Sequence, residues 1–297
     1  NGYADTKFIP SVNLSVNSTH ASLYLNTNNL PTSIDPVDLG IYNSATQSIT
    51  LLQSSGLSFN FFASRNLGSA VYTTQSTRSG FNITSKTSSI LTTLYKNGTN
   101  VISGNSGGTL PTINIYLGTI NISGSPYNTG YTNNTFAFSS IGDGLTDTDA
   151  SNLYTAVQTF QTTLNRYVGV PIVSDANAQA FLNAAQITDI TQANAVNTLV
   201  QGLKADGLWT KMKAVYPMVG GTASSCKYNL VNPQDTDAAF RLVFNGGWTF
   251  DNNGATPNGT NAYADTNLNP IGKITGQNSH VSFYSRTNND GLYADFG

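Results

Sequence analysis

The first half of the chain alternates apolar and polar residues in short runs separated by turn-forming residues. Between residues 12 and 138 such a run recurs about every ten residues, the spacing expected of short antiparallel strands. The clearest runs are residues 21–25, 39–42, 48–52, 57–61, 70–73, 80–84, 90–95, 100–102 and 112–117. Asn97-Gly98 predicts a tight hairpin, because both central residues of a type I′ turn need positive φ. This half is therefore predicted to be an antiparallel sandwich or barrel.

Beyond Gly142 the apolar positions follow a helical period instead. They predict a first helix with a cap and acidic residues at its start and helix-ending residues after it. The apolar residues are Leu153, Val157, Phe160, Leu164 and Tyr167, the cap and acids are Thr146, Asp147 and Asp149, and the ending residues are Gly169 and Pro171. A second helix is predicted over residues 174–185 and a third from residue 188, interrupted near Gly202 or Gly207. Each has one apolar stripe, so the three should pack on each other or on a sheet.

Strand-like runs return after Pro217, at residues 226–230, 238–244 and 247–250. A turn with Gly254, Pro257 and Gly259 follows and leads into a stretch that repeats the start of the chain. The segment beyond this turn is too short to close a sandwich by itself.

Residues 261–266 repeat residues 1–6, with an offset of 260 and no gap. The same offset relates Pro10 to Pro270, His20 to His280, Ser22 to Ser282, Tyr24 to Tyr284 and residues 27–29 to 287–289, and after a three-residue slip residues 38–40 match 295–297. Such a long period is that of a whole domain rather than of a solenoid unit. We expect one full repeat plus the opening of the next, with both chain ends cut inside a domain.

The composition supports a turn-rich β protein. Charged residues make up only 9% of the chain, and all fifteen acids are Asp because Glu is absent. Asn, Thr, Ser and Gly take their place, and Asn, Asp and Gly serve turns whereas Glu favours helices. This uncharged composition is common in virion appendages and extracellular fibres, so a location on a virion surface or outside a cell is expected.

Several partners are disfavoured. The net charge of −2 provides no field that would attract nucleic acid. No apolar run approaches the ~20 residues of a membrane helix, so membrane insertion is not expected. Cys226 is the only cysteine, which excludes an intrachain disulfide and a zinc cluster built on cysteines.

The residues resemble the laminin G-like, concanavalin A-like jelly-roll family. Residues 94–99 and 110–118 are similar to its late hairpin, in which a Tyr-x-Asn-Gly turn precedes a strand ending in Ile-Gly. Residues 136–154 resemble its final strand and the helix after it, and residues 208–284 resemble its opening strands. Together with Val219-Gly220-Gly221-Thr222-Ala223, these features are similar to structural proteins of tailed bacteriophages. The resemblance implies a jelly roll in a fibre or appendage.

Catalysis is not expected, and no catalytic residues are assigned. Jelly-roll glycosidases of the concanavalin-like kind use a pair of Glu residues, and this chain contains none. A site of the Ser-His-Asp type would need His20 or His280. Both lie on alternating, strand-like runs, which favours a structural histidine with a hydrogen bond.

No cofactor is predicted apart from a calcium alternative. Asp143, Asp147 and Asp149 could offer oxygen atoms to Ca²⁺, which takes about six to eight of them. The complete loop of spaced ligands is missing, and these residues lie where the first helix needs its cap. Capping or turn formation is therefore the favoured interpretation.

Tyrosines in loops are the candidates for glycan binding. Tyr127 and Tyr131 lie in a loop rich in Gly, Pro and Asn, where their rings could stack on sugars. Trp248 and Tyr263 fall within strand-like runs, and for them a core or sheet-face position is favoured.

We predict a mainly β chain: the later strands of a jelly-roll sandwich in residues 1–143, a helical linker of about three helices in 144–216, and the opening strands of the next repeat in 217–297. The predicted function is that of a non-enzymatic repeat unit of a fibre or filament, whose partners are copies of itself. The alternative is a glycan-binding adhesin on a phage or cell surface, and an enzyme acting on polysaccharide ranks third.

Overall fold

A computed structural model describes residues 2–29, 36–53 and 61–287. By compactness the chain divides into two units, residues 1–174 with 186–194 (unit 1) and residues 175–185 with 195–297 (unit 2). Each is described separately below. The boundaries expected at residues 143 and 216 stay predictions.

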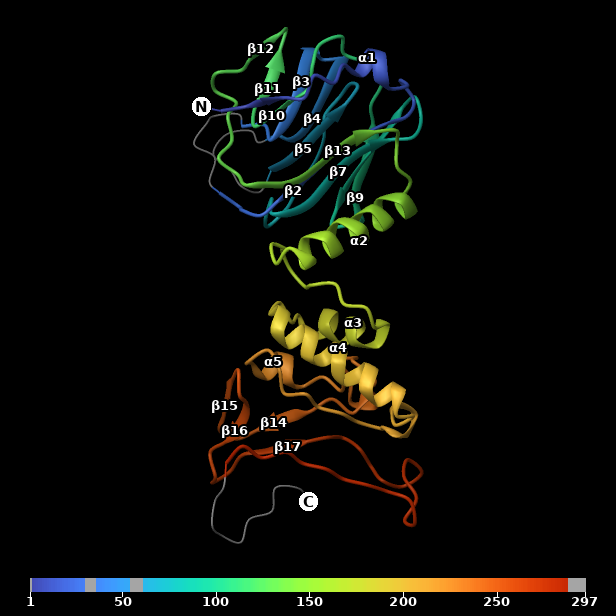
Figure 1. Ribbon diagram of the computed structural model, residues 1–297, viewed down its shortest axis with the longest axis vertical. Coiled ribbons are helices and arrows are strands. Elements are labelled where there is room, and N and C mark those ends of the chain that lie inside the picture. Colours follow the sequence, from blue (N-terminus) through green and yellow to red (C-terminus); the bar gives the residue numbers. More distant parts are fainter. Residues whose placement is uncertain (1, 30–35, 54–60, 288–297) are drawn as a thin grey trace. The chain divides into compact units, whose positions relative to one another are not determined.

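Unit 1 contains two mainly antiparallel sheets that face each other (Figure 1). The strands of the larger sheet follow the order β1 (Ala4–Asp5), β10 (Tyr116–Leu117), β3 (Leu39–Ser44), β4 (Gln47–Gln53), β5 (Phe61–Asn66) and β6 (Val71–Thr74). In addition, β11 (Ile120–Ile122) pairs with β3 in parallel and with β12 (Ser125–Pro126). The smaller runs in the order β13 (Phe136–Gly142), β2 (Thr19–Leu25), β7 (Gly80–Lys86), β8 (Leu91–Lys96) and β9 (Thr99–Asn105). The prediction of a mainly β chain is confirmed.

The two sheets share one hydrophobic core. Ala21, Leu23 and Leu25 on β2 pack there with residues of the larger sheet such as Ile41 and Leu51, and all five are fully buried. Since side chains alternate along a strand, Ser22 and Tyr24 point to the other face of the smaller sheet. Burial on both sides makes β2 a central strand.

The outer face of the smaller sheet is covered by the helix α2 (Asp147–Thr163). Its predicted start is confirmed: Thr146 Oγ1 accepts a hydrogen bond from the Asp149 backbone N–H at 3.2 Å, and the Asp149 carboxylate accepts one from the Thr146 backbone N–H at 3.1 Å. These reciprocal bonds satisfy two backbone donors that the first turn leaves unpaired. Asp149 therefore serves as a helix cap.

The predicted apolar stripe of this helix is wrong in part. The helix ends at Thr163, so Leu164 and Tyr167 lie beyond it, and Phe160 is 48% exposed. The buried positions include Gln158 and Gln161. Glutamine is buried because the sheet presents polar partners there: the Tyr24 hydroxyl donates to Gln158 Oε1 at 2.8 Å, and Gln161 Nε2 donates to the Ala137 carbonyl.

Several other local predictions can be compared with the structure. Asn97 and Gly98 have φ of 48° and 76°, which confirms the hairpin between β8 and β9. The strand expected over residues 112–117 is wrong except for β10, because Ile115 exchanges backbone hydrogen bonds with Phe8 and Thr6 outside regular strands. Most of the run at 57–61 lies outside the described residues, and β5 begins at Phe61.

Unit 2 holds α3 (Ala176–Ala185) and most of α4 (Ile190–Ala205), followed by the short helices η1 (Trp209–Lys211), α5 (Ala223–Cys226) and η2 (Asp237–Ala239). Its strands form two small pairs, β14 (Val243–Asn245) with β17 (Tyr263–Asp265) and β15 (Trp248–Asp251) with β16 (Gly254–Pro257). The strand expected at 226–230 is wrong, and the one expected at 238–244 is formed only from Val243 onward, because short helical turns and loops occupy the other positions. The three predicted helices exist, and their role as a linker stays a prediction. None of the helices in the described ranges has the length and apolarity needed to span a membrane.

The repeated sequence adopts the same local conformation twice. Lys7 and Asn267 both have a left-handed backbone, with φ of 59° and 55°. Their backbone N–H groups donate to Asp5 Oδ1 and Asp265 Oδ1 at 2.9 and 2.8 Å. Further along, the isolated bridge between Ser15 and Ser18 recurs between Thr275 and Asn278. The local backbone conformation is therefore the same at these matched positions.

Candidate functional site

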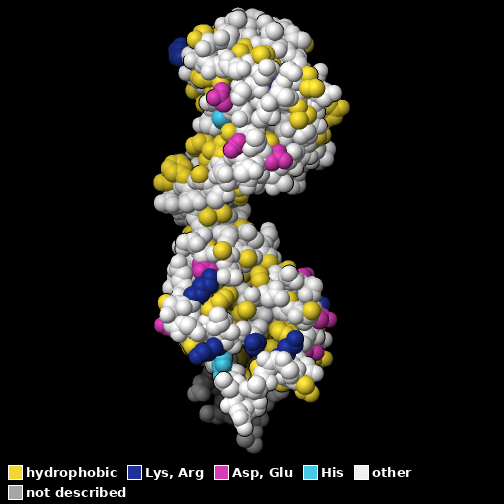
Figure 2. Space-filling model, turned by 90° about the vertical axis from the view of Figure 1, so that its right-hand side faces the viewer, with side chains coloured by type: hydrophobic (Ala, Val, Ile, Leu, Met, Phe, Trp, Pro, Cys, Tyr) yellow, Lys and Arg dark blue, Asp and Glu magenta, His cyan; other side chains and the backbone are white. Residues whose placement is uncertain are grey.

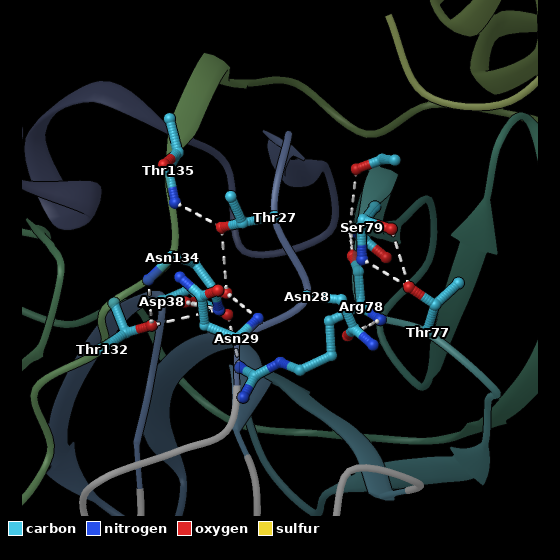
Figure 3. A network of polar contacts seen from close by, with 12 residues as sticks. Thr27, Asn28, Asn29, Asp38, Thr77, Arg78, Ser79, Thr132, Asn134 and Thr135 are labelled. Carbon is cyan, nitrogen blue, oxygen red and sulfur yellow. Dashed lines mark hydrogen bonds and ion pairs between the residues drawn. The ribbon is translucent and has the colours of Figure 1, made fainter.

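Three loops at one end of the sandwich are tied together by polar contacts (Figure 3). We call them the rim loops: residues 26–29, 76–79 and 127–135. They lie next to the start of β3 and are centred on an ion pair between Arg78 and Asp38, whose side chains are only 3% and 0% exposed. A buried ion pair costs desolvation unless further hydrogen bonds satisfy its atoms. Asn134 in the third loop supplies one such bond to Asp38.

Asn134 connects the ion pair to the first rim loop. Its Nδ2 donates to Asp38 Oδ1 at 3.1 Å, while its Oδ1 accepts from the Asn29 backbone N–H at 3.1 Å. Thr27 Oγ1 in turn accepts from the Thr135 backbone N–H at 2.8 Å. On the other side of Arg78, its backbone N–H donates to Asn28 Oδ1 at 2.8 Å. Each loop is thus held by side chains of another loop (Figure 3).

Lys96 supports the Arg78 loop from β8. Its Nζ donates to the backbone oxygens of Arg78 and Ser79 at 3.0 and 2.5 Å and to Asn82 Oδ1 at 3.0 Å. Burial, followed by the positive charge of Arg78, lowers the pKa of Lys96 to about 7. The pKa of Lys96 thus differs between the folded and the unfolded chain, and its amine holds this loop, so the stability of the loop depends on pH.

The structure places both tyrosines predicted to bind glycans in the third rim loop, where each is half-buried. The Tyr127 backbone N–H donates to the Ile120 carbonyl at 2.9 Å, and the Tyr127 carbonyl accepts from the Gly130 backbone N–H at 3.1 Å. A Cβ at Gly130 would lie 2.9 Å from Tyr127 Cδ1, so the Tyr127 ring lies directly over this glycine. Tyr131 lies between Gly130 and Thr132. The Gly130 carbonyl accepts a hydrogen bond from the Val37 backbone N–H, and the Thr132 backbone N–H donates one to the Gly118 carbonyl. The backbone beneath both rings is therefore fixed.

Two of the three aspartates weighed for calcium use their carboxylates elsewhere, and the third, Asp143, is contacted through its backbone oxygen. The Asp143 backbone oxygen contacts His20 Nδ1 at 2.5 Å, Asp147 Oδ1 accepts from the Tyr95 hydroxyl at 2.9 Å, and Asp149 caps α2. Within the described ranges, no group of three or more His, Cys, Asp or Glu side chains could hold a metal ion. The residues present therefore do not fit a calcium site assembled from these carboxylates.

His20 has the structural role expected of a strand histidine. Its Nε2 lies 3.0 Å from Ser140 Oγ, and its Nδ1 contacts a backbone carbonyl rather than a carboxylate. Burial lowers the pKa of His20, against the opposing effect of the Asp143 backbone oxygen. Trp248 packs on Phe244 and Phe250 and donates to Asn245 O. Tyr263 lies on β17 opposite Asn245 and is 62% exposed, so of the two favoured positions it has the sheet-face one and not the core one.

Sequence reasoning missed the ion pair, Asn134 and Lys96. One signal was present: residues 27–29 and Asp38 belong to the network and are among the residues that recur near the other end of the chain. Arg78 gave no such signal, because its partner lies forty residues earlier and only the tertiary fold brings the two together.

No protein-family model and no curated protein matches the sequence. Among solved structures, a variant of NanB sialidase from Streptococcus pneumoniae is similar at 14% identity and a TM-score of 0.40, covering 50% of this chain and 26% of that one. A Ruminococcus gnavus IT-sialidase CBM40 is similar at 13% identity and a TM-score of 0.32, and the match covers 46% of this chain and 82% of that one. The binding domain of Botulinum Neurotoxin DC in complex with SialylT is similar at 13% identity and a TM-score of 0.31, and the match covers 48% of this chain and 36% of that one.

At these values the similarity assigns no ligand and no activity to this chain, which spans about a quarter of the sialidase's length. None of the three is described as a laminin G-like domain or a phage protein. Those two resemblances stay predictions.

Replacing Arg78 by Met should lower the free energy of unfolding by about 3–5 kcal/mol, since the Asp38 carboxylate would remain buried without its partner. Urea titration followed by far-ultraviolet circular dichroism measures this. Lys7→Met is the matched control, because Lys7 pairs with Asp5 on the surface with 80% of its side chain exposed. Its stability should match that of the unchanged protein. Equal stability of the two variants would contradict the role given to the buried pair.

Stability should rise as pH increases from 7 toward 10.5, because the pKa of Lys96 is about 7 in the folded chain and 10.5 in the unfolded chain. In that window the unfolded state binds more protons, so raising the pH disfavours it. Urea titrations at intervals from pH 7 to about pH 9 should give a smaller slope for Lys96→Met than for the unchanged protein. Identical slopes would show that Lys96 does not titrate in this window.

Proposed function

We propose that unit 1 is a non-enzymatic glycan-binding module whose site is the set of rim loops. The observation that carries the proposal is the buried pair of Arg78 and Asp38, which fixes loops that also bear Tyr127 and Tyr131. Loops held in place before a ligand arrives lose little entropy on binding. Function on loops positioned by a rigid scaffold is the usual arrangement in β-sandwiches.

The chemistry of the rim loops suits sugars. Tyrosine rings offer flat apolar surfaces with a polar tip, while Asn28, Asn133 and Thr135 provide exposed amide and hydroxyl groups. Asp38 neutralises the Arg78 charge inside the fold. Figure 2, which turns the right-hand side of Figure 1 toward the viewer, shows a face of unit 1 away from the rim loops, where charged side chains are also few. A neutral glycan is therefore the ligand class that this site favours over an anionic one.

A binding role without turnover agrees with the sequence. The chain lacks the Glu pair of concanavalin-like glycosidases. His20 contacts Ser140, but the group that orients its other nitrogen is a backbone oxygen. Binding on a phage or cell surface is the setting we propose, with glycans as partners.

A glycan array tests this proposal. The unchanged protein should give saturable binding to neutral glycans, and Tyr127→Ala or Tyr131→Ala should weaken it about tenfold, the effect of losing one stacking ring. Tyr72→Ala is the control, because Tyr72 is an exposed tyrosine on β6 outside the rim loops. Silence across the array, or binding that survives both rim substitutions, would contradict the proposal.

A second candidate function is that of a repeat unit of a fibre, on a virion or outside a cell. It is favoured by the local conformation that recurs at an offset of 260 residues, with matching left-handed residues at Lys7 and Asn267. Repetition of a domain-sized segment suits arrays in which each unit contacts its neighbours.

Electron microscopy of the purified chain at high protein concentration tests the fibre. Filaments with a regular axial repeat of one unit are expected, because heterologous contacts that do not close produce filaments. Single particles at every concentration would contradict this second function and leave the glycan proposal untouched.

A further inference from the structure

Asn28 is the exposed residue at which the first rim loop meets the second. Its Oδ1 accepts a hydrogen bond from the Arg78 backbone N–H at 2.8 Å (Figure 3). Because a backbone N–H can only donate, the amide oxygen of Asn28 faces it and the amide nitrogen takes the other arm of the side chain. Nδ2 of Asn28 has no hydrogen-bond partner among the residues that the structure describes. Asn28 therefore offers two N–H donors to a ligand on the rim.

The N–H group that holds Asn28 is itself fixed from several directions. The Arg78 side chain is locked in the buried ion pair with Asp38. The Arg78 carbonyl accepts hydrogen bonds from Lys96 Nζ at 3.0 Å and from Asn82 Nδ2 at 2.9 Å. The amide of Asn28 is thus oriented before a ligand arrives, which lowers the entropy cost of binding.

The first rim loop is joined to the third as well as to the second. Asn29 Nδ2 donates to the Asn133 carbonyl at 2.6 Å, and the Asn29 backbone N–H donates to Asn134 Oδ1 at 3.1 Å. The neighbouring Asn28 contacts the second loop instead. The loop that presents the Asn28 amide is therefore tied to the loop that carries both tyrosines.

The donor character of Asn28 selects the kind of ligand group that pairs with it. With its oxygen occupied, the amide offers hydrogens and needs an acceptor oxygen in return. In a neutral glycan the acetamido group supplies such an acceptor, a carbonyl oxygen, together with an apolar methyl group that suits a tyrosine ring. A carboxylate would accept as well, but the rim cation Arg78 is already neutralised by Asp38. An uncharged acetamido sugar therefore matches this rim best.

We propose that the rim loops bind neutral glycans that carry an acetamido group, and that Asn28 Nδ2 donates to the carbonyl oxygen of that group. This inference rests on the proposed glycan-binding function and narrows its ligand class. The contact is a hydrogen bond between uncharged partners, so its presence should change the affinity by about tenfold.

Titration calorimetry of the full-length chain with two matched neutral oligosaccharides tests the ligand class. Chitotetraose and cellotetraose have the same backbone of linked rings, and each ring of the first carries an acetamido group where the second carries a hydroxyl. Chitotetraose should bind about tenfold more tightly. Equal affinities, or tighter binding of cellotetraose, would overturn the inference and leave the glycan-binding function standing. Binding of neither would also overturn it, and the glycan array then decides whether the glycan-binding function falls too.

Asn28→Asp tests the residue itself. The substitution keeps an oxygen that accepts from the Arg78 backbone N–H but removes both amide hydrogens. The roughly tenfold preference for chitotetraose should disappear in this variant. Asn152→Asp is the matched control, because it adds the same charge at an exposed asparagine on α2, outside the rim loops, and it should keep the preference.

Urea titration shows whether the variants remain folded. Asn28→Asp should unfold at the same urea concentration as the unchanged protein, because the bond to Arg78 is kept. A preference for chitotetraose that survives Asn28→Asp would overturn the role given to Asn28. The comparison of the two oligosaccharides in the unchanged protein depends on no variant and decides the ligand class in either case.

Discussion

A single strand that is buried on both faces organises unit 1. β2 supplies Ala21, Leu23 and Leu25 to the core between the sheets and Tyr24 to the layer under α2. Its hydrogen-bonded neighbours are β13 and β7, so its position requires the N-terminal, middle and late parts of the sandwich together. Pairings over such sequence distances are what hold an antiparallel sandwich closed.

The outer layer shows why this strand needs polar as well as apolar residues. The Tyr24 hydroxyl lies between Gln158 and the Val168 backbone, and burial raises the pKa of Tyr24 to about 12. A buried hydroxyl without partners would be costly, and here it both donates and accepts. The polar contacts thus position α2 on the sheet, while the apolar contacts supply most of the stabilisation.

The rim loops depend on the same logic at the end of the sandwich. A buried ion pair is weak evidence for stability by itself, since burial costs both charges their hydration. What the pair of Arg78 and Asp38 provides is a fixed junction for loops that are otherwise built from Asn, Thr, Ser, Gly and Tyr.

The sequence by itself determined the local features. Alternation located most strands, Asn97-Gly98 located a hairpin through its need for positive φ, and Thr146 with Asp149 located a helix start. These features depend on residues close together in the chain. The match between residues 1–29 and 261–289 was likewise visible without coordinates.

Only the tertiary structure decided which faces are buried and which distant groups meet. Helical spacing assigned Phe160 and Leu164 to the buried stripe, but the sheet beneath α2 presents polar partners and buries glutamines instead. Arg78 meets Asp38 because the packing of the two sheets brings the start of β7 near the start of β3, and spacing along the chain carries no trace of this. The two copies of the repeated strand show the same division, since nearly the same pattern of residues is buried at 19–25 and exposed at 279–285. Burial of a strand depends on the neighbours that the fold supplies.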